Sequence, residues 1–281
     1  MTEFWQLTFP MPGQSENHAR AAEDAGWDGL FFADTQCLSG DIYSAMCLAA
    51  KATKTLKVGT AVTNPVTRHA AVTASAIATV QVESNGRAVL GIGRGDSSLG
   101  LLGQNPAPAT TLAGYIENLQ GYLSGGSVDL DGFASQIHWI NASRQPKVPI
   151  DVASTGPKVI ALAARFAERI TFAMGADPVR IAQGIEDAKS AAEDAGRDPQ
   201  ELSFGAYINI ACDGDEQRAR DIIRGSTGTF AHFSGMSAAA NAGLQDEPVY
   251  QHIGANYDMA NHASGKAAHM TAVPDEFISR F

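Results

Sequence analysis

Residues 26–34 read GWDGLFFAD, and this stretch contains the unit from which the chain is built. Gly26 ends a predicted helix over 15–25, which Ser15 can cap. The apolar run 29–33 then predicts a buried strand, with Asp34 at its carboxyl end. A helix that ends at a glycine and leads into a short apolar run is typical of a parallel α/β sheet.

The same alternation continues on both sides of this unit. Further strands are predicted over 4–9, 56–62, 87–92, 148–153, 169–173 and 202–211, and further helices over 43–53, 71–83, 111–123, 157–167, 178–195 and 215–224. This order predicts an α/β protein with a (β/α)8 TIM-type barrel, whose last βα unit is missing or degenerate. One such barrel takes roughly 250 residues, so the 281 residues favour a single domain over 1–281.

Two segments depart from the alternation. Residues 124–147 contain GGS and DGF and a mixed run around Trp139, which we interpret as an insertion that can form a short hairpin. Residues 225–281 are rich in Ala, Gly, Ser and His and contain no convincing eighth strand, so an irregular C-terminal region is expected.

Composition and charge limit the possible partners. A net charge of −10 argues against a nucleic-acid-binding face, which would be basic. Cys37, Cys47 and Cys212 are scattered, as is usual for reduced thiols in a cytoplasmic protein. The sequence has neither a signal-peptide pattern nor an apolar run of about 18 residues, so no membrane association is expected.

Ligand sites of parallel barrels lie on the loops that follow the strands, and three of these loops are unusual. The first reads VGTAVTNPVTRH over 58–69. Asn64 precedes Pro65, which favours an extended backbone at the end of the strand. The segment is either a polar turn that caps the next helix or a ledge for a planar ring.

The second loop reads GIGRGDSS over 91–98, with three glycines at alternating positions. Glycine lets a backbone approach a ligand closely, but the spacing is not that of the dinucleotide fingerprint. The loop is therefore either a tight turn or a surface against a heterocycle, with Arg94 or Asp96 in contact with polar atoms.

The third loop reads STGPK over 154–158, at the start of a predicted helix. Pro157 suits the first helical position, and free backbone N–H groups beside Thr155 and Lys158 can bind an anion. Simple helix capping explains the same residues.

Together and in this order, the segments GWDGLFFAD (26–34), VGTAVTNPVTRH (58–69), ESNGRAVLGIGRGD (83–96) and ASTGPKVIALAA (153–164) resemble the luciferase-like monooxygenase superfamily. The resemblance covers roughly residues 1–224. It is strongest to the branch that uses the deazaflavin coenzyme F420, in particular to reductases similar to methylenetetrahydromethanopterin reductase.

This resemblance implies a cofactor site and a dimer. A non-prolyl cis peptide is expected between Ala61 and Val62, behind the central ring of the cofactor. The residues implied around the ring and its side chain are Asp34, Thr63, Asn64, Gly93 and Asp96, with Ala61 and Val62 at the cis peptide, and those implied near the phosphate are Thr155, Gly156 and Lys158. Arg94 of the glycine-rich loop is a further candidate for cofactor binding.

The sequence also departs from the pattern of these relatives. Relatives often carry Asp-His where this chain has Asp34-Thr35, so an acid–base role of that histidine cannot be transferred. Gln6 to Thr8 replace a segment that holds a glutamate in some reductases. The chain stops at PDEFISRF (274–281), where relatives continue into a further strand and helix.

The expected function is hydride transfer between F420 and a small organic substrate. The alternatives are an FMN-dependent monooxygenase and a non-catalytic flavin-binding protein. A barrel aldolase is disfavoured because no lysine stands at a strand end. Asp34 or His69 could transfer a proton, although a histidine at a helix start is commonly a cap. The intervals of ten and seven between His252, His262 and His269 match no common zinc motif, so no metal is expected.

Overall fold

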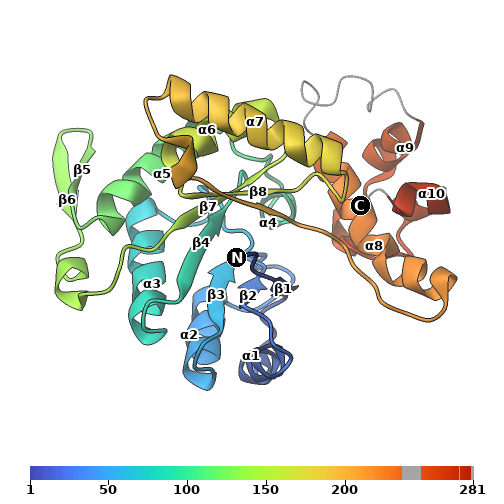
Figure 1. Cartoon of the computed structure of the whole chain (residues 1–281), viewed down its shortest axis with the longest axis horizontal. Coiled ribbons are helices and arrows are strands. Elements are labelled where there is room, and N and C mark those ends of the chain that lie inside the picture. Colours follow the sequence, from blue (N-terminus) through green and yellow to red (C-terminus); the bar gives the residue numbers. More distant parts are fainter. Residues whose placement is uncertain (236–247, 272, 280–281) are drawn as a thin grey trace. The chain divides into compact units, whose positions relative to one another are not determined.

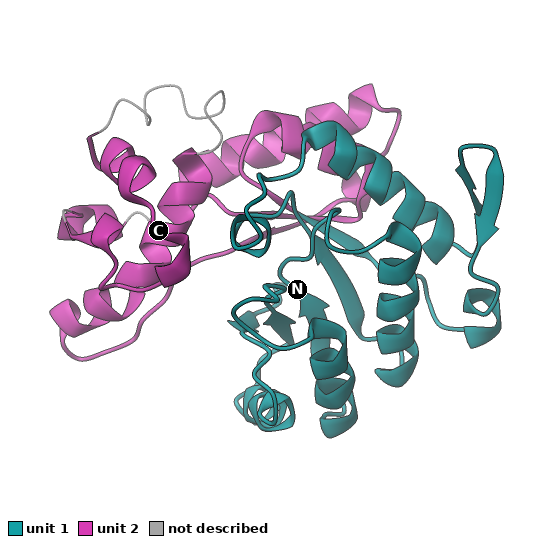
Figure 2. Ribbon diagram, turned by 180° about the vertical axis from the view of Figure 1, so that it is seen from behind, with its two compact units in different colours: residues 1–152 teal, residues 153–281 magenta. Residues whose placement is uncertain are grey.

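The computed structural model describes residues 1–235, 248–271 and 273–279. The chain divides into two compact units, Met1–Val152 and Ala153–Phe281 (Figure 2), and each is described by itself. A single barrel domain over 1–281 stays a prediction.

The first unit is built on a parallel sheet in which helices alternate with strands (Figure 1). The strands run in the spatial order β1 (Trp5–Thr8), β2 (Gly29–Phe32), β3 (Lys57–Thr60), β4 (Ala88–Ile92) and β7 (Ile150–Ser154), of which the last continues into the second unit. Phe32 pairs with Thr8 and with Thr60, so the carboxyl ends of the first three strands meet at one edge. This edge holds the loops after β3 and β4, two of the three that the sequence singles out.

Except for the short α4, which was not predicted, the helices described in this unit lie close to their predicted ranges. They are α1 (Ser15–Asp24), α2 (Ile42–Ala52), α3 (Ala70–Glu83), the short α4 (Ser97–Gly100) and α5 (Ala109–Leu123). Gly26 follows α1 with a φ of +83°, as a helix-ending glycine does. The prediction that Ser15 caps α1 is wrong, because Ser15 is the first helical residue and Gln14 occupies the cap without a side-chain bond.

The sheet core is apolar on both faces. Every residue of β2 and of β4 is buried, which is usual for strands covered by helices on two sides. Trp5 stacks on Phe31 with ring centroids 4.3 Å apart, so β1 and β2 are also joined through their side chains.

The insertion over 124–147 forms a hairpin, as expected. Strands β5 (Ser127–Leu130) and β6 (Phe133–Gln136) pair antiparallel. Asp131 and Gly132 between them both have positive φ, the backbone that a two-residue hairpin turn requires. A 3-10 helix, η1 (Ile140–Ser143), follows the hairpin.

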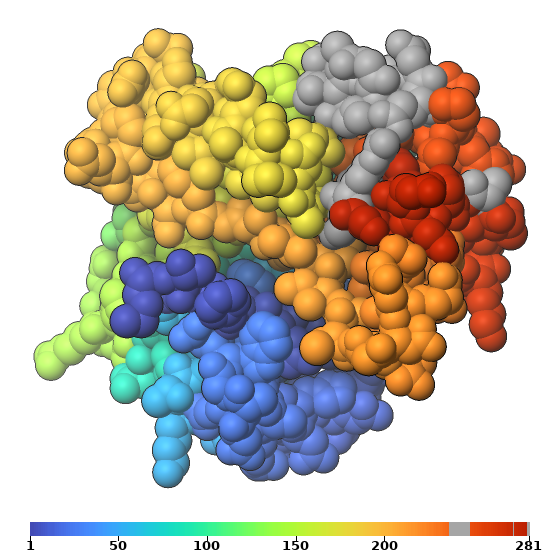
Figure 3. Space-filling view, turned by 45° about the vertical axis from the view of Figure 1, so that its right-hand side comes forward, coloured from blue at the N-terminus to red at the C-terminus, as the bar shows by residue number. Residues whose placement is uncertain are grey.

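The second unit contains two parallel strands and a group of helices. The elements are α6 (Pro157–Phe166), β8 (Arg169–Phe172), α7 (Pro178–Asp194), η2 (Pro199–Glu201), β9 (Ser203–Ala206), α8 (Glu216–Gly235), α9 (Pro248–Asn256), η3 (Met259–Asn261), η4 (Ala268–Met270) and α10 (Asp275–Ile278). Strands β8 and β9 pair in register, Arg169 with Ser203. Helix α7 exposes much of its length (Figure 3), including Val179 at 76%.

The C-terminal region is helical rather than irregular, which corrects the expectation for the described part of 225–281. Residues 236–247, 272 and 280–281 lie outside the described residues. Helix α8 runs to Gly235. Gly225 and Gly228 do not end this helix, because they lie where other segments of the second unit pack closely against it. A Cβ on Gly225 would lie 2.0 Å from the Ala263 carbonyl oxygen, and one on Gly228 would lie 2.3 Å from the Met270 sulfur.

These helices share a small core of their own. Its members are Ala231, Tyr250, Ile253, Met270, Val273, Phe277 and Ile278. The strand predicted over 202–211 is correspondingly shorter, since β9 ends at Ala206. Among the described residues, no helix is long and apolar enough to cross a bilayer.

Candidate cofactor site

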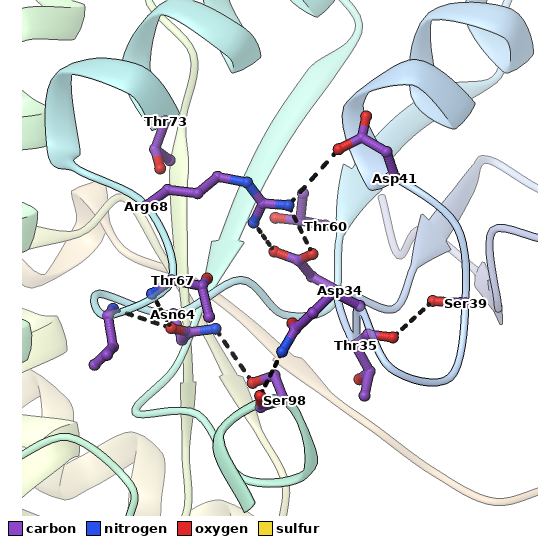
Figure 4. A network of polar contacts seen from close by, with 12 residues as sticks. Asp34, Thr35, Ser39, Asp41, Thr60, Asn64, Thr67, Arg68, Thr73 and Ser98 are labelled. Carbon is purple, nitrogen blue, oxygen red and sulfur yellow. Dashed lines mark hydrogen bonds and ion pairs between the residues drawn. The ribbon is translucent and has the colours of Figure 1, made fainter. Parts of the chain in front are cut away.

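Asn64 organises the loop that follows β3. Its side chain is fully buried, and its Oδ1 accepts hydrogen bonds from the backbone N–H groups of Val66 and Thr67, both at 3.0 Å. Its Nδ2 donates to the Ser98 hydroxyl at 3.2 Å (Figure 4). The predicted Asn-Pro turn is thus an Asx turn that also binds the loop after β4.

The loop after β2 also contacts α4, the short helix that contains Ser98. Gln36 donates from Nε2 to the Ser98 carbonyl oxygen at 2.7 Å, and the hydroxyl oxygens of Thr35 and Ser97 lie 3.3 Å apart. The loops after β2, β3 and β4 are therefore cross-linked by side chains rather than packed independently.

A two-point ion pair joins the loops after β2 and β3. Arg68 donates from Nη1 to Asp34 Oδ2 at 2.5 Å and from Nη2 to Asp34 Oδ1 at 3.2 Å (Figure 4). The Asp34 side chain is only 3% exposed. Burial by itself would lower the pKa of Arg68, but the hydrogen bond and charge of Asp34 raise it overall. The pair is therefore a buried, two-point contact between the two loops.

Two further groups surround the Arg68 guanidinium. Asp41, which caps helix α2 by accepting from the Ser44 N–H, lies 3.7 Å from Arg68 Nη2. The guanidinium carbon lies 5.2 Å from the centroid of the Tyr43 ring, within cation–π range.

The backbone of Arg68 is held from the other side by Tyr115 of α5. The Tyr115 hydroxyl donates to the Arg68 carbonyl oxygen at 2.9 Å and lies 2.6 Å from the Thr73 hydroxyl. Since the Tyr115 proton is used for the carbonyl, Thr73 donates to Tyr115. Burial raises the pKa of Tyr115, so it remains a protonated donor.

The peptide bond between Ala61 and Val62 is cis, at the position that the resemblance implies. Backbone hydrogen bonds fix this segment on both sides. Ala61 donates to the Phe32 carbonyl at 2.7 Å, and Thr63 donates to the Gly91 carbonyl at 3.0 Å. The segment therefore lies between the ends of β2 and β4.

Buried hydroxyls accumulate around this segment. The hydroxyl oxygens of Tyr43, Thr63 and Thr67 are shielded from solvent and complete no hydrogen bond. Tyr43 and Thr63 are close enough to interact, and burial together with the Asp34 charge raises the pKa of Tyr43. Neutral donors without partners are available here to a polar group.

Arg94 stabilises the glycine-rich loop after β4 through two hydrogen bonds with Ala107. Arg94 Nε donates to the Ala107 carbonyl at 2.6 Å, and the Ala107 N–H donates back to the Arg94 carbonyl at 2.9 Å. Gly95 has a φ of +84°, which explains one of the three glycines. Gly93 is buried, and its N–H donates to the Thr63 carbonyl at 3.0 Å. Asp96 is half-buried at the start of α4.

His69 is exposed and caps helix α3. Its Nδ1 accepts from the Ala71 N–H at 3.2 Å, which is the capping alternative considered from the sequence. A pocket of about 390 Å³ lies beside it, lined by Pro65, Val66, Arg68, His69, Ala70, Tyr115 and Asn118.

The residues expected near the phosphate lie in the second unit. Gly156 is the buried N-cap of α6, Pro157 occupies its first turn, and Lys158 is exposed. The backbone geometry is that of a helix start, which suits an anion.

Arg68 is a site residue that was not predicted, although it lies within the segment VGTAVTNPVTRH (58–69). A buried carboxylate such as Asp34 requires a cation, and this requirement could have directed attention to Arg68. Gln36 and Tyr115 carry no comparable signal. In the part of the chain that the structure describes, no group of three His, Cys, Asp or Glu side chains could hold a metal ion.

The fold is of the TIM-barrel class, and the connected loops after β2, β3 and β4 form a candidate ligand site at the carboxyl ends of these strands. The family of luciferase-like monooxygenases matches residues 10–281, and the chain belongs to this family. The chain is 31% identical over 241 residues to 5,10-methylenetetrahydromethanopterin reductase of Methanolobus tindarius, covering 81% of this chain and 73% of that protein.

Two further comparisons agree with this assignment. The F420-dependent hydroxymycolic acid dehydrogenase of Mycobacterium tuberculosis is 28% identical over 240 residues, covering 75% of this chain and 63% of that enzyme. The solved coenzyme F420-dependent tetrahydromethanopterin reductase of Methanopyrus kandleri superposes with a TM-score of 0.73 at 21% identity, covering 99% of this chain and 85% of that one. The predicted barrel fold is thereby confirmed.

Proposed function

We propose that this chain is an oxidoreductase that transfers a hydride between coenzyme F420 and a small organic substrate. The observation that carries the proposal is the segment from Ala61 to Arg68, which contains the cis peptide and is fixed to two neighbouring loops. The family membership and the two relatives named above as a reductase and an F420-dependent dehydrogenase support it.

The side chains at this edge fit a neutral, polar ring. The buried hydroxyls of Thr63 and Thr67 complete no hydrogen bond within the protein, and the charge of Asp34 is balanced by Arg68. The carbonyl and N–H groups of a ring can form hydrogen bonds with such hydroxyls. An unbalanced charge at this edge would oppose the burial of the ring.

The residues that would hold the cofactor ring lie on the loops after β3 and β4: Ala61, Val62, Thr63, Asn64, Gly93, Arg94 and Asp96. Thr155, Gly156 and Lys158 would hold its phosphate. When bound, F420 supplies or accepts the hydride. The protein's own part is to fix the loops, exclude water and orient the bound groups.

Asp34 and His69 keep their predicted proton-transfer roles as proposals. Both already have other contacts, because Asp34 pairs with Arg68 and His69 caps α3. Either group would have to exchange these contacts to move a proton.

A binding titration of the full chain tests the proposal. Oxidised F420 and, separately, FMN are added while the fluorescence of the tryptophans is recorded. We expect saturable binding of F420 at micromolar concentration and a weaker response to FMN. Thr63→Val removes one unpartnered hydroxyl and should weaken F420 binding about 3- to 10-fold, the value of roughly one hydrogen bond. Thr79→Val, on exposed helix surface, is the matched control and should bind normally.

Each other outcome has a definite meaning. Tight binding of FMN with no response to F420 would replace the proposal by a monooxygenase. Binding of neither cofactor would refute it. Uptake of reduced F420 without its oxidation in the presence of carbonyl and imine acceptors would favour a non-catalytic binding protein.

We also propose that the chain works in the cytoplasm as a homodimer on small-molecule substrates, without nucleic-acid partners. The family resemblance supports the dimer, and the acidic charge and separate thiols support the other two points. Sedimentation of the purified protein tests the dimer.

A further inference from the structure

We propose that Arg68 is a positioning residue of this site, which keeps the buried Asp34 carboxylate fixed in orientation and balanced in charge beside the cofactor. This inference rests on the proposed function.

Arg68 contacts several neighbouring elements through its side chain and its backbone. The guanidinium pairs with Asp34 after β2, approaches Asp41 at the start of α2, and lies over the Tyr43 ring. Its carbonyl oxygen accepts from Tyr115 of α5. One residue of the cis-peptide loop therefore contacts groups on three other elements.

The two-point geometry of the pair fixes the orientation of the Asp34 carboxylate. Two parallel N–H to oxygen bonds fix a carboxylate in plane as well as in distance, which one lysine ammonium cannot do. The Asp34 carboxylate cannot turn toward or away from the cis-peptide segment while both bonds are present. The loops after β2 and β3 are therefore held in one relative position.

Arg68 also balances the charge of Asp34. A carboxylate that is 3% exposed becomes protonated or leaves its site when its counter-charge is removed. The other ionisable groups that act on this pair are Asp41, Tyr43 and Tyr115, and none of these three is a cation. An ionised, unpaired Asp34 would repel a cofactor that carries phosphate.

A pH dependence follows from this arrangement. A buried carboxylate that has lost its counter-charge favours its neutral form, so cofactor binding by a variant without Arg68 should depend on pH. At high pH the unpaired carboxylate should weaken cofactor binding, and at low pH the neutral acid should restore much of the affinity.

The experiment compares Arg68→Lys, Arg68→Met, Asp34→Asn and the double variant Arg68→Met/Asp34→Asn in the full-length chain. The dissociation constant of oxidised F420 is measured between pH 5 and 9 and divided by the wild-type value at the same pH. This ratio cancels the part of the pH dependence that the variant shares with the wild type. Arg224→Met, which breaks the contacts of Arg224 with Asp275 and Val273 in the second unit, controls for general loss of stability.

We expect the ratio for Arg68→Met to exceed about 10 at pH 8.5 and to fall at least threefold by pH 5.5, as for a lost charge pair. Removal of the carboxylate in the double variant should give a flat profile and recover most of the affinity at pH 8.5. Arg68→Lys should show a smaller loss, because it restores charge but not the two-point geometry.

Two results would overturn the inference while leaving the proposed function intact. One is wild-type affinity in Arg68→Met at every pH. The other is a uniform loss equal to that of Arg224→Met, with no recovery in the double variant. If the wild-type protein itself does not bind F420, the proposed function fails and this inference fails with it.

Discussion

The hydroxyl oxygens of Thr35 and Ser97 lie 3.3 Å apart and join the loop after β2 to helix α4. Thr35 follows Asp34 directly, at the position where the family resemblance leads us to expect a histidine. Thr35 is 6% exposed, and its hydroxyl faces that of Ser97, so its side chain connects two loops. A threonine has no ring nitrogen with which to move a proton. This position therefore has a different task in this chain.

Thr35→Val tests that task. The substitution removes the hydroxyl and keeps the branched shape, so we expect a loss of about 0.5–1.5 kcal/mol in the free energy of unfolding. Urea denaturation measures the loss, with Thr79→Val as a control that should change stability by less than about 0.5 kcal/mol. Unchanged stability together with a large loss of F420 affinity would mean that Thr35 contacts the cofactor instead.

Gly91 cannot be replaced without moving β3. A Cβ at this position would lie 1.9 Å from the Thr60 carbonyl oxygen, one residue before the cis peptide. We expect Gly91→Ala to destabilise the chain by at least about 3 kcal/mol, or to displace the cis-peptide segment and abolish F420 binding. Thermal unfolding and the fluorescence titration together distinguish these two effects.

Gly114→Ala is the matched control for this prediction. Gly114 lies in helix α5, and a Cβ added there would have no other heavy atom of the described chain within 4 Å beyond its own helix backbone and chain neighbours. The same substitution should here stabilise the protein by about 0.5–1 kcal/mol, because alanine loses less entropy in a helix than glycine. Equal effects of the two substitutions would contradict the close contact at Gly91.

Glu23 predicts a specific pH dependence of stability. Its carboxylate accepts hydrogen bonds from the backbone N–H groups of Lys54, Thr55 and Leu56, with the nearest at 2.7 Å. Burial alone would raise its pKa, but these bonds lower the pKa to about 2 from 4.5. Because the folded-state value is the lower one, the stabilisation is fully present above about pH 4.5 and is lost as pH falls toward 2.

Glu23→Gln should therefore lower the free energy of unfolding by about 1–3 kcal/mol at pH 7 and by much less near pH 2. Urea denaturation at a series of pH values measures the difference. Glu16→Gln on the same helix removes only an exposed pair with Arg20 and should change stability by less than about 1 kcal/mol. A loss for Glu23→Gln that does not depend on pH would refute the assigned cause.

The fold was predictable because its signals are local. Helix-ending glycines such as Gly26, buried runs such as GLFF in β2, and Pro157 at the first turn of α6 are each visible within a few residues. The exceptions are also physical. Helix α8 was predicted too short because Gly225 and Gly228 resemble helix breakers until their contacts with Ala263 and Met270 are known.

The candidate site was predictable only as a set of loops. The turn at Asn64 follows from its neighbour Pro65, and the cis peptide position follows from the resemblance. The pairing of Asp34 with Arg68 spans 34 residues and depends on how two parallel strands are aligned. No local sequence pattern indicates such a pair, so each charged residue is visible in the sequence but their pairing is not.

His269 should make the stability of the C-terminal helices depend on pH in the mildly acidic range. Its side chain is fully buried, and its Nδ1 accepts from the Asp258 N–H at 3.2 Å. Burial lowers the pKa of His269 from 6.5, Asp258 opposes this effect, and His232 and His252 add to it. Because the folded-state pKa is the lower one, this contribution to stability is present above about pH 6.5 and is lost as pH falls through the folded value.

His269→Asn should remove this dependence while keeping an acceptor for the Asp258 N–H. The smaller side chain leaves a cavity, so we expect a loss of about 1–3 kcal/mol at pH 7.5, and the difference from wild type should shrink toward pH 5. Amide hydrogen exchange in residues 248–271 measures it. His138→Asn, on the exposed surface, should leave the exchange profile unchanged. If wild-type exchange in these helices is the same at pH 7.5 and 5 after correction for the intrinsic rate, protonation of His269 does not control their stability.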